Sequence, residues 1–173
     1  MNPSTRRPRR WGLAAVLGAV LTLGACDPQA IKELEEGVST EADVVQRFGQ
    51  PERVWPEAGG AKTYEYNRQP EGLRNYMITI GADGKVSALR QVLTPENFAR
   101  VQPGQGVEDV RRMLGKPARQ LPLPLKNQTV WTWKFLEPPS TTKAFNVFFG
   151  SDMRVQRTEI GPDPDGPEMR GGG

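Results

Sequence analysis

Histidine is missing from the 173-residue sequence, and cysteine occurs once, at Cys26. Without histidine, the chain has no imidazole that could serve as a general base or a metal ligand. A single cysteine excludes an intramolecular disulfide and any metal site built from several thiolates. These absences favour a protein that is not an enzyme and that uses neither a cofactor nor a metal ion.

Carboxylates remain available for acid–base chemistry. Asp83 and Asp152 follow glycine in two similar segments, "GADG" and "GSDM". Aspartate is common in turns because its side chain accepts hydrogen bonds from nearby backbone, so a turn role is favoured for both. An envelope enzyme is therefore the weakest of three hypotheses, and it requires a cleft holding a pair of carboxylates with perturbed pKa values.

The N-terminal segment has the composition of a secretion signal. Four arginines (Arg6, Arg7, Arg9 and Arg10) precede an apolar run of 13 residues from Trp11 to Leu23. The run is shorter than the roughly 20 residues that a membrane-spanning helix needs. We therefore predict that residues 1–25 are a cleaved signal peptide.

Removal of that signal changes the charge of the chain. The formal net charge is +3, and subtracting the four signal arginines leaves 19 basic and 20 acidic residues. A nucleic-acid partner is not expected, because the mature chain lacks the excess of positive charge that such proteins carry.

An internal repeat organises the rest of the sequence. Gly49 corresponds to Gly115 and Pro51 to Pro117, both at an offset of 66 residues. Aromatic segments follow at similar offsets, "TYEYN" at 63–67 and "VWTWK" at 130–134. This periodicity predicts two units, residues 26–93 and 94–160, followed by a disordered tail at 161–173.

Each unit carries signals for helix ends. Thr40 and Gly106 precede helical patterns, each with an aspartate three residues later, as in a capping box. Asp27 and Thr94 are N-cap types followed by proline. Helices are expected to end at Gly49 and Gly115 in left-handed caps.

The remainder of each unit has strand patterns. Tyr64 and Tyr66 alternate with polar residues, as do Trp131 and Trp133, and turn sequences at 81–84 and 150–153 separate later strands. We therefore predict an α+β fold of two tandem repeats. Each repeat is expected to be a short helix pair packed on a three- to four-stranded antiparallel sheet.

The aromatic residues have two interpretations. They are either core residues of the sheets or an exposed patch that anchors a protein partner, because aromatic side chains are frequent interface anchors. The candidate partner-binding residues are Trp55, Tyr64, Tyr66, Trp131 and Trp133.

The end of the predicted signal, Leu23-Gly24-Ala25-Cys26, resembles a bacterial lipobox. The resemblance implies cleavage before Cys26 and acylation of that residue, which would attach the mature chain to membrane lipid. The alternative is that Cys26 is a buried structural thiol.

Several motifs together resemble the SmpA/OmlA (BamE-type) outer-membrane lipoproteins. They are "VSTEADVVQRFGQP" at 38–51, its second copy "PGQGVEDVRRMLGKP" at 103–117, the hairpin "GADGKV" and the lipobox. The resemblance implies a lipoprotein of the outer membrane, facing the periplasm, that acts as a non-catalytic accessory in β-barrel protein assembly. Its partners would be subunits of the assembly machinery. Asp27, directly after Cys26, leaves the inner membrane as an alternative location.

The tandem arrangement also resembles the β-lactamase inhibitor protein, in which two units form one binding face. This second resemblance implies an inhibitor or binding module for another envelope protein. It is the alternative function expected from the sequence.

Overall fold

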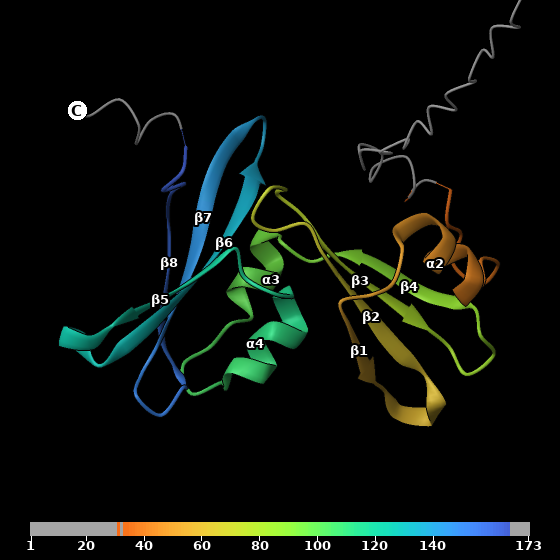
Figure 1. The fold of residues 1–173 in the computed structure, drawn as a ribbon, viewed down its shortest axis with the longest axis horizontal. Helices are drawn as coiled ribbons and strands as arrows, with labels where there is room; N and C mark the ends of the chain where they lie inside the picture. Colours follow the sequence, from red (N-terminus) through yellow and green to blue (C-terminus); the bar gives the residue numbers. More distant parts are fainter. Residues whose placement is uncertain (1–30, 32, 167–173) are drawn as a thin grey trace, which may run out of the picture.

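The computed structural model describes residue 31 and residues 33–166 (Figure 1). The predicted signal peptide at 1–25, Cys26 and Asp27 lie outside the described residues, as do residues 167–173 of the predicted tail. In the described part of the chain, no helix is long and apolar enough to cross a membrane.

Two four-stranded antiparallel sheets make up most of the described chain. The strands of each sheet follow sequence order. The first sheet contains β1 (Arg53–Pro56), β2 (Lys62–Asn67), β3 (Asn75–Ile80) and β4 (Val86–Gln91). The second contains β5 (Arg119–Leu123), β6 (Gln128–Glu137), β7 (Thr141–Phe149) and β8 (Val155–Pro162).

The helices are short. They are α2 (Glu41–Phe48), α3 (Pro95–Ala99) and α4 (Val107–Leu114), with 3-10 turns η1 (Ala58–Gly60) and η2 (Pro124–Lys126). The predicted fold, a pair of helices on a sheet in each repeat, is wrong, because strands dominate and the described helices are of at most 8 residues. Helices of two turns are marginal alone, so these depend on the sheets that they cover.

The elements form layers. Figure 1 shows α3 and α4 between the two sheets, with α2 beyond the first sheet. The first sheet is therefore covered on both faces, and four consecutive residues of β2, Thr63 to Tyr66, are buried. Coverage of both faces explains why polar residues of this sheet become buried as well as apolar ones.

The core of the first sheet lies beneath α2. Val44 and Phe48 of α2 pack on the face that carries Tyr66 and Tyr76. The Phe48 ring lies 5.2 Å from Tyr66 and 6.0 Å from Tyr76, measured between centroids. The first contact is tilted and the second is edge-to-face, and such contacts between aromatic rings add to the free energy gained by burial.

The second core lies between the second sheet and α3 and α4. Phe98 of α3 stacks on Phe145 with centroids 4.3 Å apart. Val110 and Leu114 of α4 are fully buried in the same cluster, which also includes Met77 from the first sheet. The second core therefore extends to the first sheet, and the two sheets share buried area.

In both halves of the chain, the helix that precedes the sheet ends at a glycine with the same backbone conformation. Gly49 and Gly115 follow α2 and α4 with φ of 79° and 76°, as expected for glycine, but ψ of −165° and −171°. They are therefore not in the predicted left-handed helical region but in an extended region that only glycine adopts readily. The Tyr66 hydroxyl donates to the Gly49 carbonyl, and Trp133 Nε1 donates to the Gly115 carbonyl, each at 3.0 Å.

The predicted helix starts at Thr40, Thr94 and Gly106 are confirmed. The Thr40 side chain accepts from the Asp43 backbone, and the Asp43 carboxylate accepts from the Thr40 backbone at 2.8 Å. Asp109 accepts in the same way from the Gly106 backbone at 2.9 Å. At the other end of the chain, β8 continues to Pro162, so Gly161 and Pro162 belong to the sheet rather than to a tail.

The two glycines allow a matched stability test. A Cβ at Gly49 would meet nothing within 4 Å, whereas one at Gly115 would lie 2.5 Å from Asn67 Oδ1 and 3.0 Å from Asn75 Nδ2. Gly49→Ala should cost about 1 kcal/mol of unfolding free energy from backbone strain alone. Gly115→Ala should cost at least about 1 kcal/mol more, because the new methyl group displaces packed side chains. Urea melts measure both, and equal losses would contradict the packing argument.

Candidate functional site

A buried carboxylate lies where α4 packs on the first sheet. Glu65 of β2 has 0% of its surface exposed. Its Oε2 accepts from Trp55 Nε1 at 3.0 Å, and its Oε1 accepts from Asn67 Nδ2 at 2.8 Å. Neighbouring side chains of the first sheet therefore hold the carboxylate in one orientation.

The second half of the chain supplies the opposite charge. Arg111 of α4 donates from Nε to both Glu65 oxygens at 3.2 and 3.3 Å, and from Nη2 at 3.1 Å. The backbone N–H of Lys116 also donates to Glu65, at 3.0 Å. A buried carboxylate needs this degree of pairing, because an unpaired buried charge is strongly destabilising. Glu65 thus joins α4 to the first sheet.

Asn75 extends this junction. It has 0% of its surface exposed, and its Nδ2 donates to the carbonyls of Leu114 and Lys116 at 2.8 and 3.1 Å. Carbonyls at the end of a helix lack partners within the helix. A side chain of β3 therefore completes the C-terminus of α4.

Glu52 adds a second, more exposed carboxylate at the same junction. Its Oε1 lies 2.8 Å from Lys116 Nζ and 3.7 Å from Arg111 Nη2. Burial alone would raise the pKa of the Glu52 carboxyl. Hydrogen bonds from Lys116 and Asn67, together with the charges of Lys116 and Arg111, lower that pKa below its usual value.

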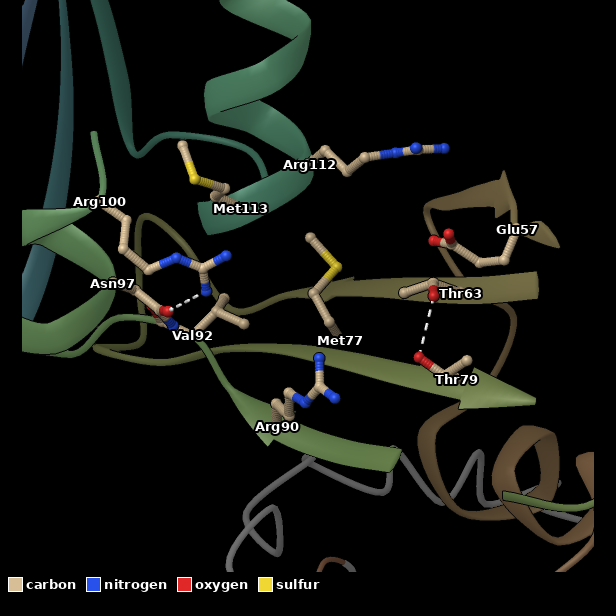
Figure 2. Close-up of a pocket in the computed structure, with 10 residues that line it drawn as sticks. All are labelled: Glu57, Thr63, Met77, Thr79, Arg90, Val92, Asn97, Arg100, Arg112 and Met113. Atoms are coloured by element: carbon tan, nitrogen blue, oxygen red, sulfur yellow. Dashed lines mark hydrogen bonds between the residues drawn. The ribbon is translucent and has the colours of Figure 1, made fainter. Parts of the chain in front are cut away.

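A cavity of about 360 Å³ lies beside this junction, between the inner face of the first sheet and α3 and α4 (Figure 2). This volume is at the small end of the range for ligand sites. The lining residues are Glu57, Thr63, Met77, Thr79, Arg90, Val92, Asn97, Arg100, Arg112 and Met113. We call this cavity the arginine cleft.

The three arginines come from different elements. Figure 2 shows Arg90 extending from β4, Arg100 from the segment after α3, and Arg112 from α4. Arg100 donates to Asn97 Oδ1 at 3.4 Å, and Arg112 donates to the Pro56 carbonyl at 3.0 Å. Throughout residues 33–166, no carboxylate forms a salt bridge with any of the three.

The arginine cleft therefore has a positive charge that the described residues do not neutralise. Its lining contains three guanidinium groups and one carboxylate, Glu57. A guanidinium group suits planar oxyanions, since it can donate two parallel hydrogen bonds. Met77 and Met113 provide adaptable apolar contacts beside these groups.

The aromatic residues predicted as partner-binding anchors do not form an exposed patch. Each has at most 8% of its surface exposed: Trp55, Tyr64, Tyr66, Trp131 and Trp133. Four of them are core residues of the two sheets, and Trp55 is held beneath two guanidinium groups. The guanidinium carbons of Arg53 and Arg112 lie 4.0 and 5.2 Å from the centre of its ring.

Sequence reasoning missed the residues of the junction and of the cleft. Glu65 alternates with Tyr64 and Tyr66, so a sheet with one covered face would have placed it in solvent. One signal was available: the matching position in the second repeat is Thr132, which shows that the two repeats differ at this point. The arginines gave no signal, because the packing of α4 on the first sheet brings them together.

The turn role favoured for Asp83 and Asp152 agrees with their contacts. Asp83 Oδ1 accepts from the Lys85 backbone, and Asp152 Oδ1 accepts from the Arg154 backbone, both at 3.1 Å. Within the described part of the chain, no group of three or more Cys, Asp or Glu side chains could hold a metal ion.

Comparisons with known proteins gave three weak structural matches. No family model and no curated protein matches the chain. A DUF4309 family protein (YjgB) from Bacillus subtilis is 21% identical over 79% of this chain and 86% of its own, with a TM-score of 0.32. A candidate β-lactamase inhibitor protein from Streptococcus mutans is 13% identical over 71% of this chain and 82% of its own, with a TM-score of 0.34. An extracellular protein from Bacillus anthracis with an SCP domain is 12% identical, with a TM-score of 0.31, and the chain spans 50% of its length.

The predicted membership of the SmpA/OmlA (BamE-type) lipoproteins is wrong. No family model supports it, and the matched structures are of other kinds. The motif that carried the resemblance caps and ends a helix, and unrelated proteins use the same residues for that purpose. The comparisons also add nothing to the lipoprotein prediction. One of the matched structures is a candidate β-lactamase inhibitor protein, the kind of protein named in the alternative function, and a TM-score of 0.34 carries no argument about ligand or partner.

The contribution of Glu65 to stability can be compared with that of an exposed ion pair. Arg53 and Glu108 form such a pair between the two halves of the chain, with a closest contact of 3.2 Å. Glu65→Gln should lower the free energy of unfolding by about 3 kcal/mol, because Arg111 keeps only its longer contact with Glu52 and because the amide N–H₂ of Gln would face other N–H donors. Glu108→Gln should cost less than about 1 kcal/mol, since Glu108 is solvated. Urea denaturation measures both, and similar losses would contradict the role given to Glu65.

The contacts of Glu52 predict that the stability of the fold depends on pH. Its pKa in the folded state lies below the ordinary value of 4.5, so its ionised form stabilises the fold above that pH. This contribution is lost as the pH falls through the lowered pKa. Melting temperatures between neutral pH and pH about 3 should therefore fall less steeply for Glu52→Gln than for the wild type. Identical slopes would contradict the assigned contacts.

Proposed function

We propose that the chain is a non-catalytic binding module that captures an acidic segment of another envelope protein in the arginine cleft. The observation that carries this proposal is the set of three arginines, Arg90, Arg100 and Arg112, that line one cavity without carboxylate partners in the described structure. A binding partner with carboxylates would supply the missing negative charge.

The exposure of the cleft favours a protein segment over an enclosed small molecule. All three arginine residues are exposed, whereas a small-molecule site normally buries most of its ligand. Arginine and methionine are enriched at protein interfaces, and both line this cleft. A partner would therefore place an acidic side chain among the guanidinium groups and contact the two methionines.

A non-catalytic role is supported by the chemistry available to the chain. The sequence has no histidine, and the two aspartates in corresponding positions bind turn backbone. An envelope location follows only from the sequence prediction of a signal peptide at 1–25. Acylation of Cys26 stays a prediction, tested by mass spectrometry of the mature protein.

Binding to a labelled oligoglutamate peptide tests the cleft. The variant Arg90→Gln/Arg100→Gln/Arg112→Gln should lower affinity at least tenfold, because each charge-assisted hydrogen bond contributes about 1.5 to 3 kcal/mol. The matched control, Arg74→Gln/Arg119→Gln/Lys126→Gln, removes three exposed cations outside the cleft lining. It should change affinity less than about threefold, since it removes only long-range attraction that salt screens.

Equal weakening by the two triple variants would contradict the proposal, because it would show binding by overall charge. Competition by inorganic phosphate at concentrations comparable with those of the peptide would also contradict it, and would indicate a site for small anions. Fluorescence anisotropy of the labelled peptide, at low and moderate salt, measures both the affinities of the variants and the competition by phosphate.

A further inference from the structure

The outer edge of β8 is open. In the second sheet β8 pairs with β7, and no described strand lies on its other side. Only the first residue of β8, Val155, has backbone partners among the described residues on that side. Its carbonyl accepts from the Gly104 N–H and its N–H donates to the Gln105 carbonyl, both at 2.8 Å. Residues 156–160 are all exposed. The open edge therefore begins after Val155.

The other three sheet edges are protected against pairing with a further strand. β5 has Pro122 within the strand, and proline cannot donate to a neighbouring strand. β1 is only 4 residues long. On β4, the Glu36 carboxylate accepts from the Leu89 N–H at 2.8 Å. These are the devices by which proteins prevent unwanted strand pairing. β8 is 8 residues long and its proline, Pro162, is its last residue, so a run of exposed backbone follows Val155.

The sequence of β8 is complementary to itself. Arg157 and Glu159 flank Thr158 and lie on the same sheet face, where they pair with each other at 2.7 Å. If two copies paired in antiparallel fashion about Thr158, Arg157 of each copy would face Glu159 of the other. A register centred on Arg157 or Glu159 would instead place like charges opposite each other, which is unfavourable.

We propose that two copies of this chain associate by antiparallel pairing of their β8 edges, centred on Thr158. The pairing joins two second sheets into one eight-stranded sheet about a two-fold axis. Backbone hydrogen bonds supply the attraction, and the two Arg157–Glu159 pairs between copies set the register. This proposal is independent of the arginine cleft.

Cysteine crosslinking tests the register in the full chain carrying Cys26→Ser. Residues directly opposite in an antiparallel pair have Cα atoms about 4.5 to 5.5 Å apart, which a disulfide can span. Thr158→Cys should therefore form covalent dimers under mild oxidation. Ile160→Cys is the control on the same strand, 49% exposed. Its two copies would lie about 14 Å apart, so it should form few dimers. Equal crosslinking, or none at Thr158→Cys, would overturn the proposal.

A charge exchange tests the same contact without a new covalent bond. Arg157→Glu places glutamates opposite each other and should weaken dimerisation at least tenfold in sedimentation equilibrium. Arg157→Glu/Glu159→Arg restores opposite charges and should return the dimer to near wild-type strength. Circular dichroism checks that each variant is folded. A wild-type chain that stays monomeric at all concentrations, or a double variant as weak as the single one, would overturn the proposal.

Discussion

The arrangement of this protein depends on the pairing of one buried carboxylate, Glu65, with Arg111. A carboxylate without solvent is tolerated only when it is fully paired, and here the pairing groups come from both halves of the chain. The requirement to satisfy Glu65 therefore positions α4 against the first sheet. That position in turn forms the wall of the arginine cleft, because Arg112 and Met113 follow Arg111 on the same helix.

The duplicated glycine corners explain why similar phrases recur in the sequence. In each half, an aromatic side chain on the second strand of the sheet donates to the carbonyl of the glycine that ends the helix, Tyr66 to Gly49 and Trp133 to Gly115. The aromatic residues are therefore part of a structural unit of helix end and strand, rather than recognition anchors.

Local features of the fold were predictable from the sequence. The helix starts, the turns at 81–84 and 150–153 and the positive φ at Gly49 and Gly115 depend on neighbouring residues, so short patterns reveal them. The balance of helix and sheet was misjudged, because capping signals mark where a helix begins and ends but not how much of the fold it supplies. The partners of Glu65 and the position of the cleft were not predictable, since they arise from contacts between Glu65 and a helix 46 residues away, and the difference from Thr132 marks only the position of Glu65 itself. The family resemblance failed for a related reason: it relied on local capping phrases that many folds can use.

Glu65 and its partners join the two sheets into one cooperative structure. Differential scanning calorimetry of the wild-type protein tests this most directly, because it distinguishes one unfolding transition from two. We predict a single transition whose calorimetric and van't Hoff enthalpies agree. Two separate transitions would show that the sheets unfold independently, and would contradict the claim.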